Sequence, residues 1–280
     1  MKKIVLIPNP IKDNGLLVTY KLAGKLLDLG LDVYIAEDAA DCELPLIRYK
    51  EFPSDADLII VVGGDGSVID ASRYAIDYGI PIIGVNLGRV GYLSEVDPEE
   101  LDLFSRLVSG EYLVKEKLLL TVEVPATRSR DVFAVNDIIV SHGEYLGISD
   151  FKLEDSLGNS IGYRADGVIV ATPQGSTAYS FSSGGPVLAH DVEGILVTPV
   201  CPHSFFNRSV LFNSAEVLTV ENTGSHAMNI TVDGRRYDVL NPQEKCKIRC
   251  ADRRIKMLTF SENKMFTGLF KKMNVTEGLK

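Results

Sequence analysis

The chain has 280 residues, of which 45% are hydrophobic and 24% charged, and its formal net charge is −9. This composition is typical of a globular protein of one or two domains, and a negative chain without long Lys or Arg runs is not expected to bind nucleic acid regardless of sequence. The first ten residues lack the apolar core of a signal peptide and no stretch is long enough to span a membrane, so we expect a cytoplasmic protein with no membrane partner.

Strand and helix patterns alternate in the first third of the chain. Apolar runs predict strands at residues 3–8, 31–36, 56–62 and 80–86, and periodic segments predict helices at 16–29, 67–77 and 97–110. Asn14 is predicted to cap the first helix, and Asp97 the third. This alternation indicates an α/β domain with a parallel sheet over residues 1–115, and the tail 264–280 is expected to pack back on it.

From about residue 116 the pattern becomes strand-like runs separated by turns. Examples are residues 117–125, 131–142, 150–164, 166–172 and 215–224. They predict a β-rich, sandwich-like domain over residues 116–263.

The four cysteines do not suggest a disulfide framework. Cys42 and Cys201 stand alone, whereas Cys246 and Cys250 alternate with basic residues in "KCKIRC". Period-2 alternation favours a strand with both thiols on its buried face over a metal pair, which would need further ligands.

The stretch "VVGGDGSVIDA" (61–71) puts three glycines, Gly63, Gly64 and Gly66, between a predicted strand and a predicted helix. Bare N–H groups at a helix N-terminus bind anions, so we expect a phosphate site. The dinucleotide motif G-x-G-x-x-G fails because Ile69 takes the last glycine position, and no P-loop motif is present. The alternative is a tight turn with Asp65 as a helix cap.

The negative charge of Asp65 repels phosphate, so Asp65 is expected to have a role other than direct binding of the phosphate group. It could hold a Mg²⁺ ion that bridges phosphates. It could also take the proton of an acceptor hydroxyl during phosphoryl transfer. Both roles require phosphate nearby.

Two polar stretches could hold the rest of a ligand. Residues 164–188 are rich in hydroxyl groups and include Tyr179, whose ring could stack on a ligand, although a small-residue loop packed on a sheet would look the same. Asn136 and Asp137 interrupt an apolar run, where they would bind sugar hydroxyls or mark a β-bulge.

Two further features of the sequence are weaker signals. "GNSIG" (158–162) matches G-x-S-x-G but lies in a predicted hairpin turn, so it is not a hydrolase nucleophile. The histidines, His142, His190, His203 and His226, show no metal-ligand spacing.

Taken together, the chain resembles the bacterial NAD kinases. The resemblance is carried by "GGDG" (63–66), "VNLGRVGYL" (85–93), "ND" (136–137), "YRADGVIVATPQGSTAYSFSSGGPVL" (163–188) and "TPVCPHSFFNR" (198–208). It implies an α/β domain, a β-rich domain and a site between them. It also implies transfer of the γ-phosphoryl group of ATP, with Mg²⁺, to the 2′-hydroxyl of the adenosine ribose of NAD, and a homodimer or homotetramer.

The resemblance also assigns roles to residues of this chain. Asp65 matches the proposed general base, and Asn136 and Asp137 match an Asn-Glu pair that contacts NAD, with Asp one methylene shorter than Glu. Asp166 matches an acid that reaches a neighbouring subunit's site. The full set of expected ligand-binding residues is Gly63, Gly64, Gly66, Tyr92, Asn136, Asp137, Arg164, Asp166, Thr177, Ala178, Tyr179, Ser182, His203 and Asp233.

The sequence thus predicts a transferase, an NAD kinase. Two other functions stay open: a kinase with the same glycine loop that acts on a lipid or a sugar, and a nucleotide sensor without turnover. An intact Asp65 argues against the sensor, because a sensor needs no base.

Overall fold

The computed structural model describes residues 1–280 except 40–43, 89–90, 125–131, 145–146, 190 and 262–280. Cys42, His190 and the predicted packing of residues 264–280 therefore lie outside the described residues. The contacts divide the chain into two units, Met1–Glu116 with the chain from Ile255, and Lys117–Arg254. Two strands, β7 (Leu113–Glu123) and β17 (Lys245–Thr259), run through the two points where the chain passes from one unit to the other.

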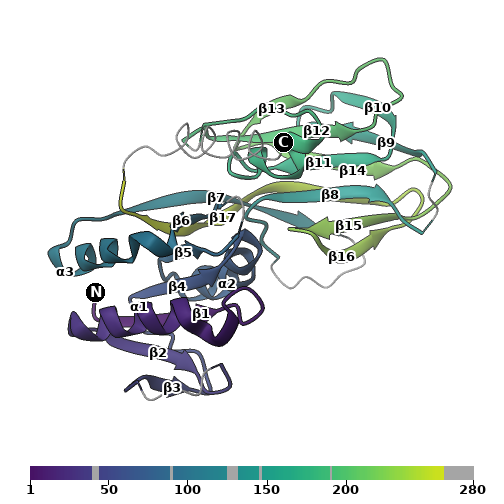
Figure 1. The fold of residues 1–280 in the computed structure, drawn as a ribbon. Helices are drawn as coiled ribbons and strands as arrows, with labels where there is room; N and C mark the ends of the chain where they lie inside the picture. The colour runs from purple at the N-terminus through teal and green to yellow at the C-terminus, as the bar shows by residue number, and fades with distance from the viewer. Residues whose placement is uncertain (40–43, 89–90, 125–131, 145–146, 190, 262–280) are drawn as a thin grey trace, which may run out of the picture. The chain divides into compact units, whose positions relative to one another are not determined.

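The first unit is built on a parallel sheet (Figure 1). Its strand order is β3-β2-β1-β4-β5, every pair is parallel, and β6 and Met257 of β17 also pair in parallel with β5. All six residues of the central strand β4 are buried, as expected for a strand covered on both faces. The strands are β1 (Lys3–Pro8), β2 (Asp32–Ala36), β3 (Ile47–Tyr49), β4 (Leu58–Gly63), β5 (Ile82–Asn86) and β6 (Ser94–Val96).

The helices of this unit are close to those predicted, with two corrections. α2 (Asp65–Tyr78) buries Val68, Ala71 and Ala75 on one face and ends at Gly79. Asn14 does not cap the first helix: Asn14–Leu16 form a short 3-10 turn (η1) before α1 (Leu17–Asp28). The carboxylate of Asp13 takes the capping role, because it accepts hydrogen bonds from the N–H groups of Val18 and Thr19 at 3.0 and 2.9 Å.

The third predicted helix is largely a 3-10 helix. Asp97 caps it as predicted, in a capping box with Glu100. The segment continues from η2 (Pro98–Ser105) into the single turn α3 (Arg106–Ser109), and Gly110 follows in the left-handed conformation.

The second unit is a two-layer β-sandwich. One layer has the order β10-β9-β14-β17, and the other is the antiparallel sheet β13-β12-β11-β8-β15-β16. Its further strands are β8 (Asp137–His142), β9 (Ser149–Glu154), β10 (Ser160–Ala165), β11 (Gly167–Ala171), β12 (Gly194–Val200), β13 (Val210–Asn213), β14 (Val217–Asn222), β15 (Met228–Val232) and β16 (Arg235–Leu240). Between β11 and β12 lie two short turns of helix, η3 (Gly175–Thr177) and α4 (Tyr179–Ser182).

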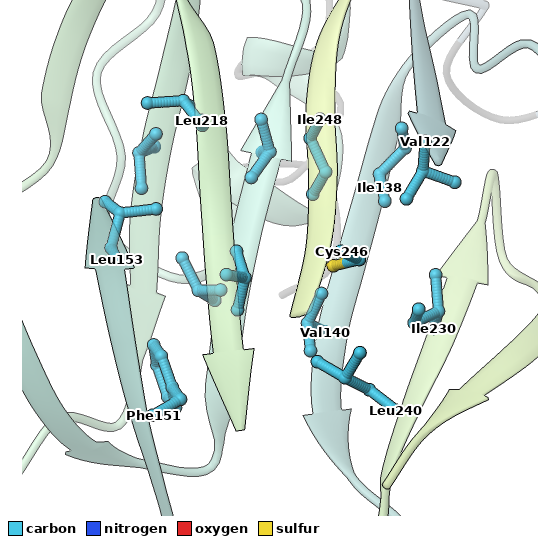
Figure 2. Packing of buried hydrophobic residues seen from close by; sticks show 14 of the residues in the cluster. Val122, Ile138, Val140, Phe151, Leu153, Leu218, Ile230, Leu240, Cys246 and Ile248 are labelled. Carbon is cyan, nitrogen blue, oxygen red and sulfur yellow. The ribbon is translucent and has the colours of Figure 1, made fainter. Parts of the chain in front are cut away.

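The core of this sandwich is made by side chains from both layers (Figure 2). Phe151, Leu218 and Ile248 come from one layer, and Ile138 and Val140 come from the other. All five are at most 1% exposed. The α/β and sandwich-like fold class predicted from the sequence is therefore confirmed.

The cysteines of β17 lie where their alternation predicts. Cys246 is fully buried on β17 and Cys250 is partly buried beside the same core, so the core interpretation is confirmed. Within the described part of the chain, no group of three or more His, Cys, Asp or Glu side chains could hold a metal.

"GNSIG" spans the β9–β10 hairpin turn, as predicted. In the same described part, no helix is both long and apolar enough to cross a membrane.

Candidate functional site

Three loops meet at the carboxyl edge of the parallel sheet, because β1, β4 and β5 are neighbours and run in the same direction. The loops follow Pro8, Gly63 and Asn86, where these strands end. Ligands of open parallel sheets bind at this edge, so the loop after β4 has the position expected of a phosphate site.

Gly63 is required by close packing. A Cβ atom on Gly63 would lie 2.5 Å from Ser67 Oγ and 3.2 Å from Asn9 Cβ, so no side chain fits there. The Asn9 side-chain amide donates to Ser67 Oγ at 2.7 Å, and its backbone N–H donates to the carbonyl of Val62 at 2.8 Å. The loop after β1 is thus fixed against the end of β4 and the first turn of α2.

Asp65 is not a helix cap. It is the first residue of α2, Gly64 occupies the N-cap position, and no side chain caps this helix. The Asp65 carboxylate instead accepts hydrogen bonds from the N–H groups of Tyr92, Leu93 and Ser94 at 2.8, 2.9 and 3.3 Å. The alternative of a simple capped turn is therefore wrong.

These bonds have two consequences. The carboxylate is held in one orientation beside the uncapped N-terminus of α2, and the segment that leads into β6 is fixed by Asp65. Among the described residues, Oδ2 accepts one hydrogen bond, from Tyr92, and Oδ1 accepts the others, so Oδ2 keeps capacity for a proton or a cation. The side chain of Tyr92 lies close enough that burial, and then the Asp65 charge, raise the pKa of its phenol.

Lys12 belongs to this group and was missed by the sequence analysis. Its ammonium lies directly over Gly64, where a Cβ atom would collide with Nζ. It also lies 3.7 Å from the position that a Cβ on Gly88 would take. The signal in the sequence is "NPIK" (9–12) directly after the first strand, which has no recognised motif spacing.

In the second unit, the Asn136–Asp137 segment is held from one side by Asp233. The Asp233 carboxylate accepts hydrogen bonds from the N–H groups of Val135, Asn136 and Asp137 at 2.7, 2.8 and 3.1 Å. The Asp233 N–H donates to the Asp137 carbonyl at 3.0 Å. Asp233 has a φ of +46° in the β15–β16 turn, a conformation that Asp tolerates better than most residues.

The stretch after β11 holds the same segment from the other side. The Thr172 N–H donates to the Asn136 carbonyl at 2.8 Å, and the Thr172 hydroxyl donates to the Val135 carbonyl at 2.7 Å. Gly175 packs so closely that a Cβ atom on it would lie 2.8 Å from the Asn136 Cα. Asn136 thus directly precedes β8 and Asp137 is its first residue, and the registers of β8 with β11 and β15 are regular, so the bulge interpretation is wrong.

Asp137 is the most perturbed carboxyl group of this cluster. It is 4% exposed. Burial, and secondarily the neighbouring charge of Asp233, raise its pKa from 3.8 to about 7. Burial also raises the pKa of Asp233, although its three backbone N–H partners oppose this. A carboxyl group kept in such surroundings is typical of a functional site.

The expected ligand-binding residues of this unit fall into two groups. Thr177, Ala178, Tyr179 and Ser182 belong to the stretch that packs on Asn136, and Tyr179 is 46% exposed. Arg164, Asp166 and His203 form another group: His203 N–H donates to the Arg164 carbonyl at 2.7 Å, and Arg164 pairs with Asp150 at 3.2 Å.

The second group lies at the other end of the sheet from Asp137. Asp137 pairs with Ala171 at the end of β11, whereas Asp166 immediately precedes its first residue, Gly167. The five residue steps from Asp166 to Ala171 span roughly 16 Å, so Asp166 and its neighbours are not part of the Asn136–Asp137 cluster.

The fold and the two clusters define an α/β unit, with a glycine loop at the carboxyl edge of its parallel sheet, joined to a β-sandwich that carries a buried pair of acids. The models of the ATP-NAD kinase N-terminal and C-terminal domains match residues 47–112 and 135–260. The NAD kinase of Natranaerobius thermophilus is 32% identical over 98% of both chains. That of Caldanaerobacter subterraneus subsp. tengcongensis is 36% identical over 84% of this chain and 86% of its own. The chain belongs to the NAD kinase family.

Solved structures agree with this assignment. An NAD kinase from Archaeoglobus fulgidus, solved in complex with ATP, has a TM-score of 0.73 and 25% identity, covering 98% of this chain and 99% of its own. Yeast NADH kinase, solved with NADH, has a TM-score of 0.84, covering 98% and 88% of the two chains. At 22% identity the latter likeness concerns the fold alone.

Proposed function

We propose that this NAD kinase transfers the γ-phosphoryl group of ATP to the 2′-hydroxyl of the adenosine ribose of NAD, with Asp65 as the general base. The observation that carries this role is the Asp65 carboxylate, fixed by three backbone N–H groups beside an uncapped helix N-terminus with one oxygen still able to accept. A fixed acceptor next to a phosphate site is what proton removal from an attacking hydroxyl requires.

The step balances without a further reactant. The hydroxyl O–H bond breaks and its proton passes to Asp65. A bond forms between the ribose oxygen and the γ-phosphorus, while the bond from that phosphorus to the β–γ bridging oxygen breaks. The products are NADP and ADP.

NAD binding is proposed for the cluster around Asn136 and Asp137. The backbone bonds from Asp233 and Thr172 hold this segment in place, which leaves the side chains of Asn136 and Asp137 for hydroxyl groups of the ligand. Tyr179 offers a half-exposed ring at the start of α4, four residues after Gly175, which packs on Asn136. Asp233 is assigned a supporting role, because its carboxylate already accepts three N–H bonds.

Mg²⁺ is proposed to accompany ATP. Within the described residues no cluster of three or more ligating side chains exists, so the chemistry fits an ion carried mainly by phosphate oxygens, with Asp65 Oδ2 as an available protein ligand. When bound, the ion would neutralise charge on the phosphates. Measuring the activity of an Asp65→Asn variant over a range of Mg²⁺ and Mn²⁺ concentrations separates the two roles of Asp65. Activity that recovers at high metal concentration indicates a metal ligand, and activity that does not recover supports the general base.

A homodimer or homotetramer is also proposed. Its support is the fully exposed Phe205 in the segment after β12, next to His203 and the Arg164 group. Light scattering after size-exclusion chromatography should give a multiple of 30.7 kDa, and a mass near that value would contradict the proposal.

The reaction is tested by incubating the protein with Mg²⁺-ATP and either NAD, diacylglycerol or a free sugar. We expect ADP only with NAD, together with an equal amount of NADP detected by an NADP-specific dehydrogenase. Phosphorylation of the lipid or the sugar in place of NAD would overturn the proposal.

A further inference from the structure

We propose that Lys12 is an ATP-binding residue whose ammonium contacts the terminal phosphates over the glycine loop. The inference rests on the proposed function, since it assigns one more residue to the ATP site. It starts from the position of Nζ above Gly64, one residue before the proposed base.

The backbone of Lys12 is placed by a turn. The Asn9 side-chain carbonyl accepts hydrogen bonds from the N–H groups of Ile11 and Lys12 at 3.1 and 3.2 Å, and the Lys12 N–H also donates to the Asn9 carbonyl at 3.1 Å. Asn9 is itself bonded to Ser67 and Val62. The loop that carries Lys12 is therefore fixed to both β4 and α2, and from this backbone position the side chain places Nζ over Gly64.

Positive charge gathers at this place. Lys12 Nζ lies over the N-cap residue of α2, where the helix dipole is positive and no side chain caps the N–H groups. Among the residues that the structure describes, no carboxylate pairs with Lys12. The nearby Asp65 carboxylate faces the N–H groups of residues 92–94. An ammonium, uncapped N–H groups and a positive helix end converge on one point, which a phosphate would neutralise.

The alternative is a solvated surface lysine, because Lys12 is exposed. The two interpretations differ in whether the ammonium charge of Lys12 contributes to ATP binding and phosphoryl transfer. A lysine that binds the terminal phosphates contributes a charge-assisted bond as a point charge. Its loss should weaken ATP binding and slow transfer, because negative charge on these phosphates is redistributed in the transition state. A solvated lysine contributes neither.

The test compares Lys12→Met with Lys12→Arg and with the control Lys21→Met. Lys21 is an exposed lysine of the same unit, on α1, away from the glycine loop. For Lys12→Met we expect kcat/KM for ATP to fall roughly 10- to 100-fold, the range of a lost charge-assisted bond. The KM for NAD should change little, Lys12→Arg should recover part of the loss, and Lys21→Met should match the wild type.

A second measurement is independent of turnover. Calorimetric titration of each variant with ATP, without NAD, should show the same order of affinities, and the difference between Lys12→Met and wild type should shrink as salt is raised. If wild type makes NADP and Lys12→Met equals it in both assays, the inference on Lys12 is wrong. If wild type makes no NADP, the proposed function fails, and the ATP titration still decides whether Lys12 binds ATP.

Discussion

Replacing Asp137 by Asn should stabilise the protein and weaken its function at the same time. The native pKa of Asp137 is about 7, against a usual value of 3.8, because the group is buried and faces Asp233. The folded protein therefore holds a proton on this group between about pH 4 and 7 that the unfolded chain has released. Stability falls as the pH rises through this window.

The size of the effect follows from the same values. A rise from 3.8 to about 7, at about 1.4 kcal/mol per pKa unit, corresponds to about 4 kcal/mol. Asn is nearly isosteric and does not titrate. Asp137→Asn should thus be more stable than wild type by up to about 4 kcal/mol at pH 8, and the difference should vanish near pH 4.

The assay is urea unfolding of wild type, Asp137→Asn and the control Asp252→Asn at several pH values from 4 to 8. Asp252 is an exposed acid whose side chain is 94% accessible, so its variant should show no such pH dependence. NAD affinity of Asp137→Asn, measured at pH 8 by calorimetry, should fall by roughly 1.5–3 kcal/mol through loss of a charged acceptor. A stability difference that is equal at pH 5 and 8 would refute the argument on burial, and unchanged NAD affinity would refute the role in binding.

Three further changes test other parts of the account. Tyr179→Ala should raise the KM for NAD with a smaller effect on kcat and almost none on the KM for ATP, because stacking is similar in ground and transition states; equal damage to both substrates would mean a structural role. Gly175→Ala should weaken NAD binding because its methyl group would meet the Asn136 backbone, and calorimetry should show this with ATP binding preserved. Phe151→Ala should lower the free energy of unfolding by about 3–5 kcal/mol, since the ring is 1% exposed in the sandwich core, and a loss below 1 kcal/mol would contradict that packing.

The order of strands and helices could be predicted because each half has its own periodicity. The continuous apolar run of β4 indicates a strand that is buried on both faces. The alternation at Cys246 and Ile248 indicates a strand that is buried on one face. The prediction that Asn14 caps the first helix is wrong for a physical reason. Asp13 and Asn14 are both residues that cap helices well, and the 3-10 turn before α1 determines which of the two side chains reaches the helix. The pattern of 97–110 could not distinguish an α-helix from a 3-10 helix.

The chemistry-bearing residues could be named from the sequence, but not their partners. Asp65 was identified by its glycine neighbours, yet its bonds to residues 92–94 depend on how the segment before β6 returns to α2. Asp233 was expected to bind the ligand, whereas its carboxylate is bonded to the backbone of residues 135–137. Lys12 is distinguished from other exposed lysines only by lying over Gly64, which no sequence pattern shows.

The most direct test of the central claim is the rate of NADP formation by wild type and by Asp65→Asn at saturating Mg²⁺-ATP and NAD. Asn keeps the size and one acceptor oxygen of the side chain but cannot take the proton. We expect wild type to form NADP and ADP in equal amounts, and Asp65→Asn to show a kcat lower by roughly 10²–10⁴-fold, the usual contribution of a general base, with unchanged circular dichroism. Near-normal turnover of Asp65→Asn, or no NADP from wild type, would contradict the account.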